Sequence, residues 1–268
     1  MRRKFSFFVL VAAAAGAAGV VGMAGSRACA STIYNDTFAR GTTAKPTALN
    51  GSTPAPTDTN NATWSVGAGI PADDNTIMTT NGSGAYVTSN SQSAVAVLGG
   101  LAPLTNVGLY TLSATLTPTA GSTTNWLSLG FGNTTATSSG NPELGNAWLL
   151  YRDNGGTQTF YGNTGTSNGE NGGTALTKGE ADTFTITLNS STGAVGFSDT
   201  LGLVSRTGTL TSTQMGDINA LMLGALSMTG SFKDAELTYS AIPEPASLGL
   251  MALGGLGILL VGKRRETA

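Results

Sequence analysis

The chain has 268 residues, of which 10% are charged and 7% aromatic, with 38 glycines, one cysteine and no histidine. The lack of histidine excludes Ser-His-Asp and Cys-His nucleophiles and the usual zinc sites, and a single cysteine excludes internal disulfides and iron–sulfur clusters held by cysteines. The formal net charge of −2 argues against nucleic acid as a partner, because binding it requires a concentrated basic surface.

The N-terminus has the pattern of a secretory signal peptide, which we place at residues 1–30. A cationic start precedes an uncharged run at 5–25, in which Ala and Gly predominate. Ala28 and Ala30 supply the small-x-small pattern, so we expect signal peptidase to cut after Ala30. A retained membrane helix is the alternative, but Ala and Gly gain little on transfer to lipid. The start Arg-Arg-Lys-Phe leaves both Sec and twin-arginine export open.

Residues 31–240 predict one β domain. This region has thirteen acidic and six basic side chains and forty threonines, which are β-branched and suit a pleated surface. Apolar residues alternate with Thr or Ser in 109–117 and 182–188, and similar alternation marks 127–131 and 235–239. Further candidate strands are 32–38, 62–66, 85–89, 94–98, 147–152, 157–161, 194–199 and 221–228. The one helical turn expected is at 212–219, so the pattern favours an antiparallel sandwich.

The order of these strands resembles concanavalin A-like or laminin G-like jelly rolls. A long alternating strand is followed by a strand bearing Trp126 and by a strand that ends in Tyr-Arg-Asp-Asn-Gly at 151–155. The resemblance covers most of 31–240 and rests on architecture. It implies the fold class that we expect here, an all-β, antiparallel jelly-roll-type β-sandwich.

Catalytic and metal-binding patterns are sparse, so we expect no enzyme activity, no metal and no cofactor. A glycosidase needs two carboxyl groups about 5–10 Å apart, and the Glu-x-Asp string of retaining enzymes on this jelly roll is missing. Aspartates could still pair in space, which leaves a hydrolase open. Asp73–Asn75 and Asp153–Gly155 offer oxygen ligands for calcium, but these residue types are first of all turn formers. The core glutamates are isolated in the sequence: Glu143, Glu170, Glu180 and Glu236.

Three aromatic residues are the candidates for sugar contact, because flat rings pack on the C–H faces of sugars. Trp126 is out of phase with the apolar residues of 127–131, so it is expected to point away from the main core. Both faces of 148–151 are apolar, so Trp148 or Tyr151 could leave the core. The alternative is that these rings fill a sandwich whose strands are covered on both sides. Trp64 is expected to pack near the start of the core.

The C-terminus predicts a membrane helix that acts as a sorting tail at 242–268. Residues 245–262 carry no charge, and a helix of that length is just long enough to span a bilayer. A basic cluster follows at once, which places the end of the chain in the cytoplasm. A buried core helix would not explain that cluster.

This arrangement resembles the PEP-CTERM sorting signal, with a tripeptide, an apolar helix and a basic end in the family's order. The resemblance implies a tail read by an exosortase, and export by bacteria that make extracellular polysaccharide. It implies a cell-surface or matrix destination and no particular activity for the domain in front. The residues that carry it are Pro243, Glu244, Pro245, Lys263, Arg264 and Arg265.

These patterns together predict an exported, non-enzymatic surface or matrix protein. It would be anchored in the membrane through its tail and associated with extracellular polysaccharide, by weak sugar contact through Trp126, Trp148 or Tyr151. The alternatives are a polysaccharide-active glycoside hydrolase and an adhesive module that binds another protein.

Overall fold

The structure is a computed structural model that describes residues 30–42, 44, 45, 47–58, 62–68, 78–87, 93–100, 104, 106–120, 125–133, 146–152, 157–161, 169–171, 179–202 and 204–242. The predicted signal peptide, apart from Ala30, and the predicted membrane helix lie outside these residues. The sorting residues 243–265 lie outside them too. Within the described part, Ala30–Ile242 belongs to one compact unit.

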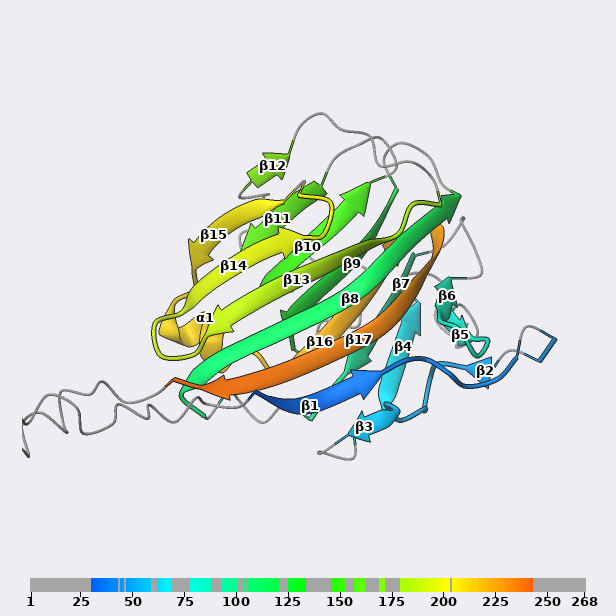
Figure 1. Ribbon diagram of the computed structural model, residues 1–268, viewed down its shortest axis with the longest axis horizontal. Helices are drawn as coiled ribbons and strands as arrows, with labels where there is room; N and C mark the ends of the chain where they lie inside the picture. Colours follow the sequence, from blue (N-terminus) through cyan, green and yellow to red (C-terminus); the bar gives the residue numbers. More distant parts are fainter. Residues whose placement is uncertain are drawn as a thin grey trace, which may run out of the picture. The chain divides into compact units, whose positions relative to one another are not determined.

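Two antiparallel sheets contain all the strands of the described residues, as the sequence predicts for an all-β domain. The ten-stranded sheet has its longest strands side by side, in the order β14, β13, β8, β17 (Figure 1). Its strands are β1 (Ser31–Asp36), β2 (Thr47–Ala48), β3 (Pro56–Asp58), β5 (Met78–Thr80), β6 (Ala85–Val87), β8 (Gly108–Ala120), β13 (Asp182–Asn189), β14 (Ala194–Asp199), β15 (Ser205–Thr209) and β17 (Thr229–Ala241).

The second sheet has seven strands, in the order β12-β11-β10-β9-β16-β7-β4. Among the described residues there is a single short helix, α1 (Ser212–Gly216), which precedes β16, the neighbour of the central strand β9. The helix begins with a capping box between Thr211 and Gln214. The strands of this sheet are β4 (Trp64–Ala68), β7 (Ser93–Leu98), β9 (Trp126–Gly132), β10 (Ala147–Arg152), β11 (Thr157–Tyr161), β12 (Gly169–Asn171) and β16 (Ala220–Leu226).

The ten-stranded sheet has one apolar face and one hydroxyl-bearing face. Along β8 and β13 buried residues alternate with half-buried ones, and the half-buried positions are almost all Thr or Ser. The register sets Thr183 opposite Thr115 and Thr185 opposite Ser113, and the hydroxyls of Thr115 and Thr183 are 2.7 Å apart. We call this surface, formed by the outward residues of β8 and β13, the hydroxyl face.

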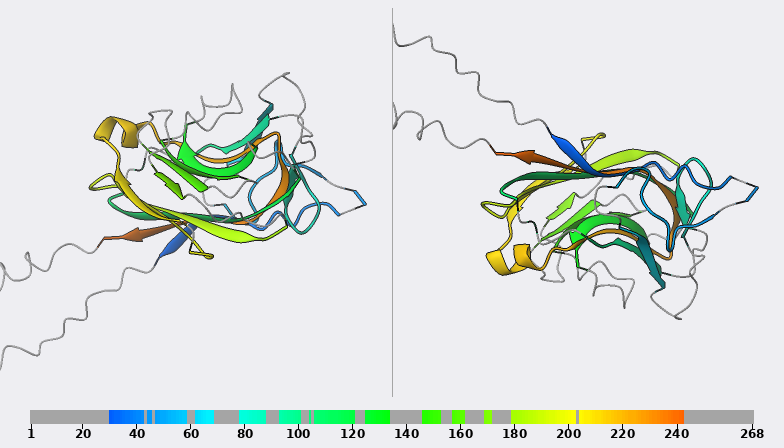
Figure 2. Two further views of the ribbon diagram at one scale, coloured as in Figure 1. Left: turned by 90° about the horizontal axis from the view of Figure 1, so that it is seen from above. Right: turned by 90° about the horizontal axis from the view of Figure 1, so that it is seen from below.

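The two sheets face each other and enclose the core between them, as Figure 2 shows from two sides. Leu112 and Ile186 of the ten-stranded sheet belong to the same buried cluster as Leu129 and Leu223 of the seven-stranded sheet. Burying such side chains is worth roughly 1.5–3 kcal/mol each, which makes this layer the main source of stability. A β-sandwich is therefore the architecture of the described residues.

A buried carboxylate joins the two sheets near the N-terminus of the domain. Asp36, at the end of β1, is 1% exposed and forms a two-bond ion pair with Arg40, at 3.0 and 2.7 Å. It also accepts hydrogen bonds from the indole Nε1–H of Trp64 on β4, at 2.7 Å, and from the backbone N–H of Phe38, at 2.8 Å. Trp64 itself is buried in the main core, as the sequence predicts.

Candidate functional site

The three rings predicted to contact sugar are all buried. Trp126 and Trp148 are 5% and 3% exposed and pack together with ring centroids 6.2 Å apart, in a small cluster separate from the main core. Trp126 therefore points away from the core, as its phase predicts. Tyr151 lies on the other face of the sheet, is 0% exposed and packs on Phe184 across the sandwich.

These positions correct the expectation that one of the three rings is open to solvent. Every residue of β9 is buried, so the described strand is covered on both faces, which is the alternative that the sequence left open. Tyr151 fills space between the two sheets, whereas Trp126 and Trp148 are buried against each other on the opposite face of the seven-stranded sheet, because both faces of β9 and β10 are apolar. A ring buried in this way offers no face on which a sugar could stack.

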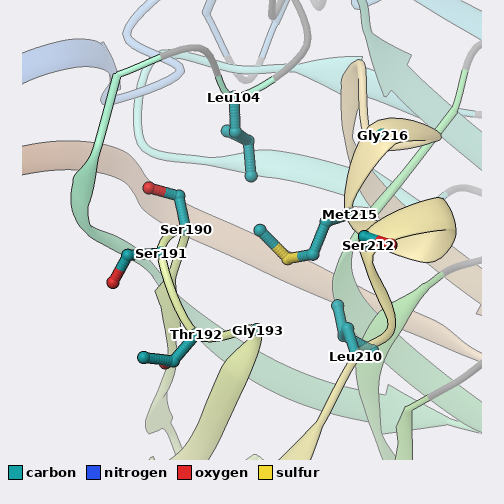
Figure 3. A pocket seen from close by; sticks show the side chains of 9 residues that line it. All are labelled: Leu104, Ser190, Ser191, Thr192, Gly193, Leu210, Ser212, Met215 and Gly216. Atoms are coloured by element: carbon teal, nitrogen blue, oxygen red, sulfur yellow. The ribbon is translucent and has the colours of Figure 1, made fainter.

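A surface pocket of about 350 Å³ lies at the other end of the fold, between the turn that joins β13 to β14 and helix α1 (Figure 3). Leu104 and Met215 extend toward each other across it, and the turn supplies backbone and hydroxyl groups from the side. The lining residues are Leu104, Ser190, Ser191, Thr192, Gly193, Leu210, Ser212, Met215 and Gly216.

The turn side of this pocket is held rigidly by its own hydrogen bonds. The Ser190 hydroxyl donates to the carbonyl of Asn106 at 2.8 Å and accepts from the N–H of Gly108 at 2.9 Å. Asn189 accepts from the N–H and the hydroxyl of Ser191. Gly193 has φ +72°, and a Cβ there would run into the carbonyl of Leu210, so only glycine suits this position.

The chemistry available in the pocket is neutral. Its lining combines hydroxyls with aliphatic and thioether groups, and no acidic or basic side chain takes part. Such a surface can hydrogen-bond and pack against an uncharged group about the size of one sugar ring, but it offers no proton donor or acceptor of suitable pKa for catalysis. Sequence analysis missed this pocket because turn residues distant in the chain form it, and none of them carries a recognisable pattern.

A pair of carboxyl groups, also missed by the sequence, lies where β13 begins and β14 ends. Asp182 is 0% exposed, and its Oδ1 accepts from the N–H and the hydroxyl of Thr200, at 3.1 and 2.8 Å. The pKa of Asp182 is raised from 3.8 to about 6, chiefly by burial and also by the neighbouring carboxyl of Asp199, although the hydrogen bonds from Thr200 lower it. Asp199 accepts from the N–H of Val204 at 2.9 Å.

Metal-binding clusters are not found in the described ranges, where no group of three or more His, Cys, Asp or Glu side chains could hold an ion. The turns considered for calcium, 73–75 and 153–155, lie outside the described residues. The isolated glutamates Glu180 and Glu236 are well separated in the fold, since Glu236 lies on β17 opposite Asn35 and Ser113, and Glu180 precedes β13.

The end of the domain leads into a known sorting signal. Residues 241–265 match the family model of the PEP-CTERM protein-sorting motif. The chain carries this motif. It starts at Ala241, the last residue of β17, and its presence implies that the protein is exported. In the described part of the chain no helix is long and apolar enough to span a membrane.

Comparison with solved structures gives lectin-like proteins at low sequence identity. Arcelin-5, a lectin-like defence protein from Phaseolus vulgaris, is 12% identical with a TM-score of 0.43, over 67% of this chain and 93% of arcelin. Winged bean acidic lectin is 10% identical, with a TM-score of 0.45, over 79% and 99%.

A carbohydrate esterase from the Shiga toxin-encoding bacteriophage phi24B is 12% identical to this chain. Its TM-score is 0.48, over 80% of this chain and 100% of the esterase. No curated protein matches the chain. At these TM-scores the likeness carries no argument about a ligand or an activity.

Proposed function

We propose that this protein is an exported, non-enzymatic component of the cell surface or extracellular matrix. It is processed by signal peptidase and an exosortase, held in the membrane through its tail until sorting, and associated with extracellular polysaccharide through weak contacts. The observation that carries the proposal is the sorting motif at 241–265. The jelly-roll architecture expected from the sequence is part of the same proposal.

The hydroxyl face supports contact with a hydrated, uncharged polymer. Its residues expose Thr and Ser hydroxyls in register on neighbouring strands about 4.8 Å apart. Hydroxyl groups donate and accept hydrogen bonds equally well, so they can exchange bonds with water or with sugar hydroxyls at little net cost. Contacts of this kind are individually weak, but many of them to the same polymer chain add up to stable multivalent binding, as a matrix protein needs.

The pocket between α1 and the β13–β14 turn is our candidate for the more specific sugar contact. It replaces the three buried rings in this role. Its aliphatic floor, formed by Leu104, Leu210 and Met215, can pack on the C–H groups of a sugar. The surrounding hydroxyls can bond to the sugar's edge, with Ser191, Thr192 and Ser212 all exposed.

The geometry of the acidic residues supports a non-enzymatic protein over the hydrolase alternative. The carboxyl of Asp199 is near enough to raise the pKa of the buried Asp182. The catalytic carboxyls of glycosidases instead stand about 5–10 Å apart on the two sides of a cleft. Asp182 is also fully buried, and neither residue lines the pocket. The adhesive module that binds a protein remains the second candidate, favoured by the hydroxyl face and by the lack of an open ring at the three predicted positions.

The experiment is fractionation combined with polysaccharide binding. Cells that produce the full chain should yield it from the surface or matrix fraction, and the full chain in detergent should be retained on extracellular polysaccharide and on members of a glycan array. Gly216→Leu should lower retention, because Gly216 lines the pocket and a Cβ there meets no other atom, so a bulky side chain can be added at the pocket without disturbing the fold. Thr213→Leu, exposed on the same helix and outside the pocket, is the matched control.

Recovery of intact chain from the cytosol would refute export. Retention on no glycan, together with capture of a specific protein, would favour the adhesive module. Equal retention of Gly216→Leu and the unsubstituted chain would remove the pocket from the contact surface.

A further inference from the structure

Exposed apolar side chains gather at one end of the ten-stranded sheet. Among the described residues four large hydrophobic side chains are exposed, and three of them, Val107, Leu109 and Ile242, lie where β8 begins and β17 ends. The most exposed is Val107, at 63%. A single exposed apolar residue is ordinary on a protein surface, but three together mark a contact surface. We call this surface, formed by Val107, Leu109 and Ile242, the apolar end.

The register of the strands brings these three residues together. Ala241 pairs with Gly108 and Ser240 pairs with Leu109, so Ile242 comes level with Val107 on the neighbouring strand. The fourth exposed residue, Leu201, lies at the opposite end of the sheet, because it follows β14, which starts beside the end of β13 and runs back along it.

The chain before β8 is held firmly, so the exposure of Val107 belongs to a fixed surface. The Tyr239 hydroxyl donates to the carbonyl of Val107 at 3.0 Å, and the Tyr239 ring packs on Tyr110 with centroids 5.0 Å apart. The hydroxyls of Ser190 and Tyr110 both donate to the carbonyl of Asn106, at 2.8 and 3.3 Å. A surface that is already ordered loses little conformational entropy when it binds.

Both ends of the domain lead from this end of the sheet toward segments expected in the membrane. Ser31, the first residue of β1, pairs with Tyr239, so β1 begins where β17 ends (Figure 1). The expected signal peptide stops just before Ser31, and the uncharged run of the tail starts three residues after Ile242. Three residues of extended chain span at most about 11 Å. A tail seated in a bilayer therefore keeps the apolar end close to the lipid headgroups.

The chemistry of this end suits uncharged lipid headgroups. The segments 106–112, 189–194 and 237–242 contain no acidic or basic residue. They therefore offer no cation to an anionic lipid. Aliphatic side chains and tyrosines are groups that proteins place at a membrane interface, and hydroxyls there can hydrogen-bond to headgroups and water.

We propose that the apolar end rests on the surface of the bilayer that holds the tail, with Val107, Leu109 and Ile242 among the headgroups of zwitterionic phospholipid. The inference rests on the membrane tail of the proposed function and adds the surface by which the domain itself meets lipid. This contact would keep the domain in one orientation, with the opposite end of the sheet and Leu201 in water.

The test is fluorescence quenching of the full chain in phosphatidylcholine vesicles, some of whose lipids carry a nitroxide on the headgroup. Val107→Trp places a fluorophore in the apolar end, and Leu201→Trp is the matched control at the opposite end. Both positions are exposed, so the fold should tolerate the new ring. The nitroxide should remove most of the emission that Val107→Trp adds to the unsubstituted chain, whose three tryptophans are buried, and should spare the emission of Leu201→Trp.

A second pair of variants separates lipid contact from tethering alone. Leu109→Asp, added to Val107→Trp, places a charge in the apolar end and should restore most of the quenched emission. Leu201→Asp in the same background should leave the quenching unchanged. Salt at roughly 1 M, where the Debye length is about 3 Å, should also leave it unchanged, because no charged group takes part in the contact.

Flotation with the vesicles reports on the tail separately. If the chain does not float with them, the membrane tail of the proposed function is refuted and the inference falls with it. If the chain floats but Val107→Trp and Leu201→Trp are quenched equally, or neither is quenched, only the inference is overturned. Quenching that survives Leu109→Asp would mean that the tether alone brings Val107 to the lipid. Shielding of Val107→Trp from a water-soluble quencher in native membranes, without quenching in vesicles, would replace lipid by a membrane protein as the partner.

Discussion

Replacing Asp36 by alanine should be among the most damaging single changes in this domain. Its carboxylate is the one acceptor described for the Nε1–H of Trp64 and for the N–H of Phe38, and both of these bonds are buried. Because Asp36 lies on the ten-stranded sheet and Trp64 on the seven-stranded sheet, the substitution also breaks a polar link between the layers.

The expected cost follows from the groups left behind. A buried donor without a partner costs about 1–3 kcal/mol, and the two N–H groups together therefore account for about 4 kcal/mol. Arg40 adds less, because its side chain is 20% exposed and can turn toward water. Whole domains are stable by about 5–15 kcal/mol. For a domain of about 210 residues the loss corresponds to a fall in melting temperature of roughly 8–16 °C.

Differential scanning calorimetry of the purified protein measures this directly. Asp217→Ala removes the same charge from an exposed position and should melt close to the unsubstituted protein. Asp36→Asn should fall between the two, since it keeps an acceptor oxygen for Trp64 but loses the charge that holds Arg40. A melting temperature for Asp36→Ala within about 2 °C of the control would refute the reasoning, because it would mean that both N–H groups find other partners at no cost.

Three further predictions concern pH, packing and sorting. The pKa of Asp182 is about 6 in the folded protein, above its ordinary 3.8, so the folded state binds a proton more tightly than the unfolded chain does. The free energy of unfolding should therefore fall by at most about 3 kcal/mol as pH rises from about 4 through 6. Urea titrations of Asp182→Asn should lack this slope. Gly130→Ala should destabilise the fold by about 1–3 kcal/mol, because the new methyl group meets Trp148 and the carbonyl of Ala147, whereas Gly216→Ala meets nothing and should be neutral or stabilising; equal melting temperatures would contradict this. Replacing residues 243–245 with alanine should leave the melting temperature unchanged but alter processing, as gel mobility of the surface fraction would reveal, and unaltered processing would count against the tripeptide's role.

The strands β8 and β13 could be predicted because their sequences alternate strictly, and several others because apolar or aromatic runs are bounded by turn residues. The pattern in 182–188 became β13, and 147–152, 157–161 and 194–199 became strands with those same bounds. In each case tertiary contacts reinforce what the local pattern favours. The helix expected at 212–219 is present but ends at Gly216, since Asp217 closes it as the C-cap.

Other strands escaped prediction for physical reasons. In β15, Ser205–Thr209, four of five residues are exposed, so no buried face imposes a period of two. β2 and β5 have two and three residues, too few for any pattern, and form only because β6 and the rest of the sheet are there to pair with.

The candidate sites were harder still to foresee, because each depends on residues brought together by the fold. The sequence showed that Trp126 lies off the main core but not that Trp148 packs on it and shields it. It likewise allowed that aspartates could pair in space, without showing that Asp182 and Asp199 are the two. Only the sorting signal is a continuous string, and it could be recognised directly.

The place of β17 in its sheet determines how a mechanical load would reach the domain. This strand runs straight into the sorting tail, and it is bonded along one side to β8 and along the other to β1 and β6. A pull on Ile242 is directed along the strand, so it acts as shear on bonds that lie across it. Those bonds must fail together rather than open one after another from an edge. A protein tethered by such a strand should resist tension better than one tethered by an outer strand.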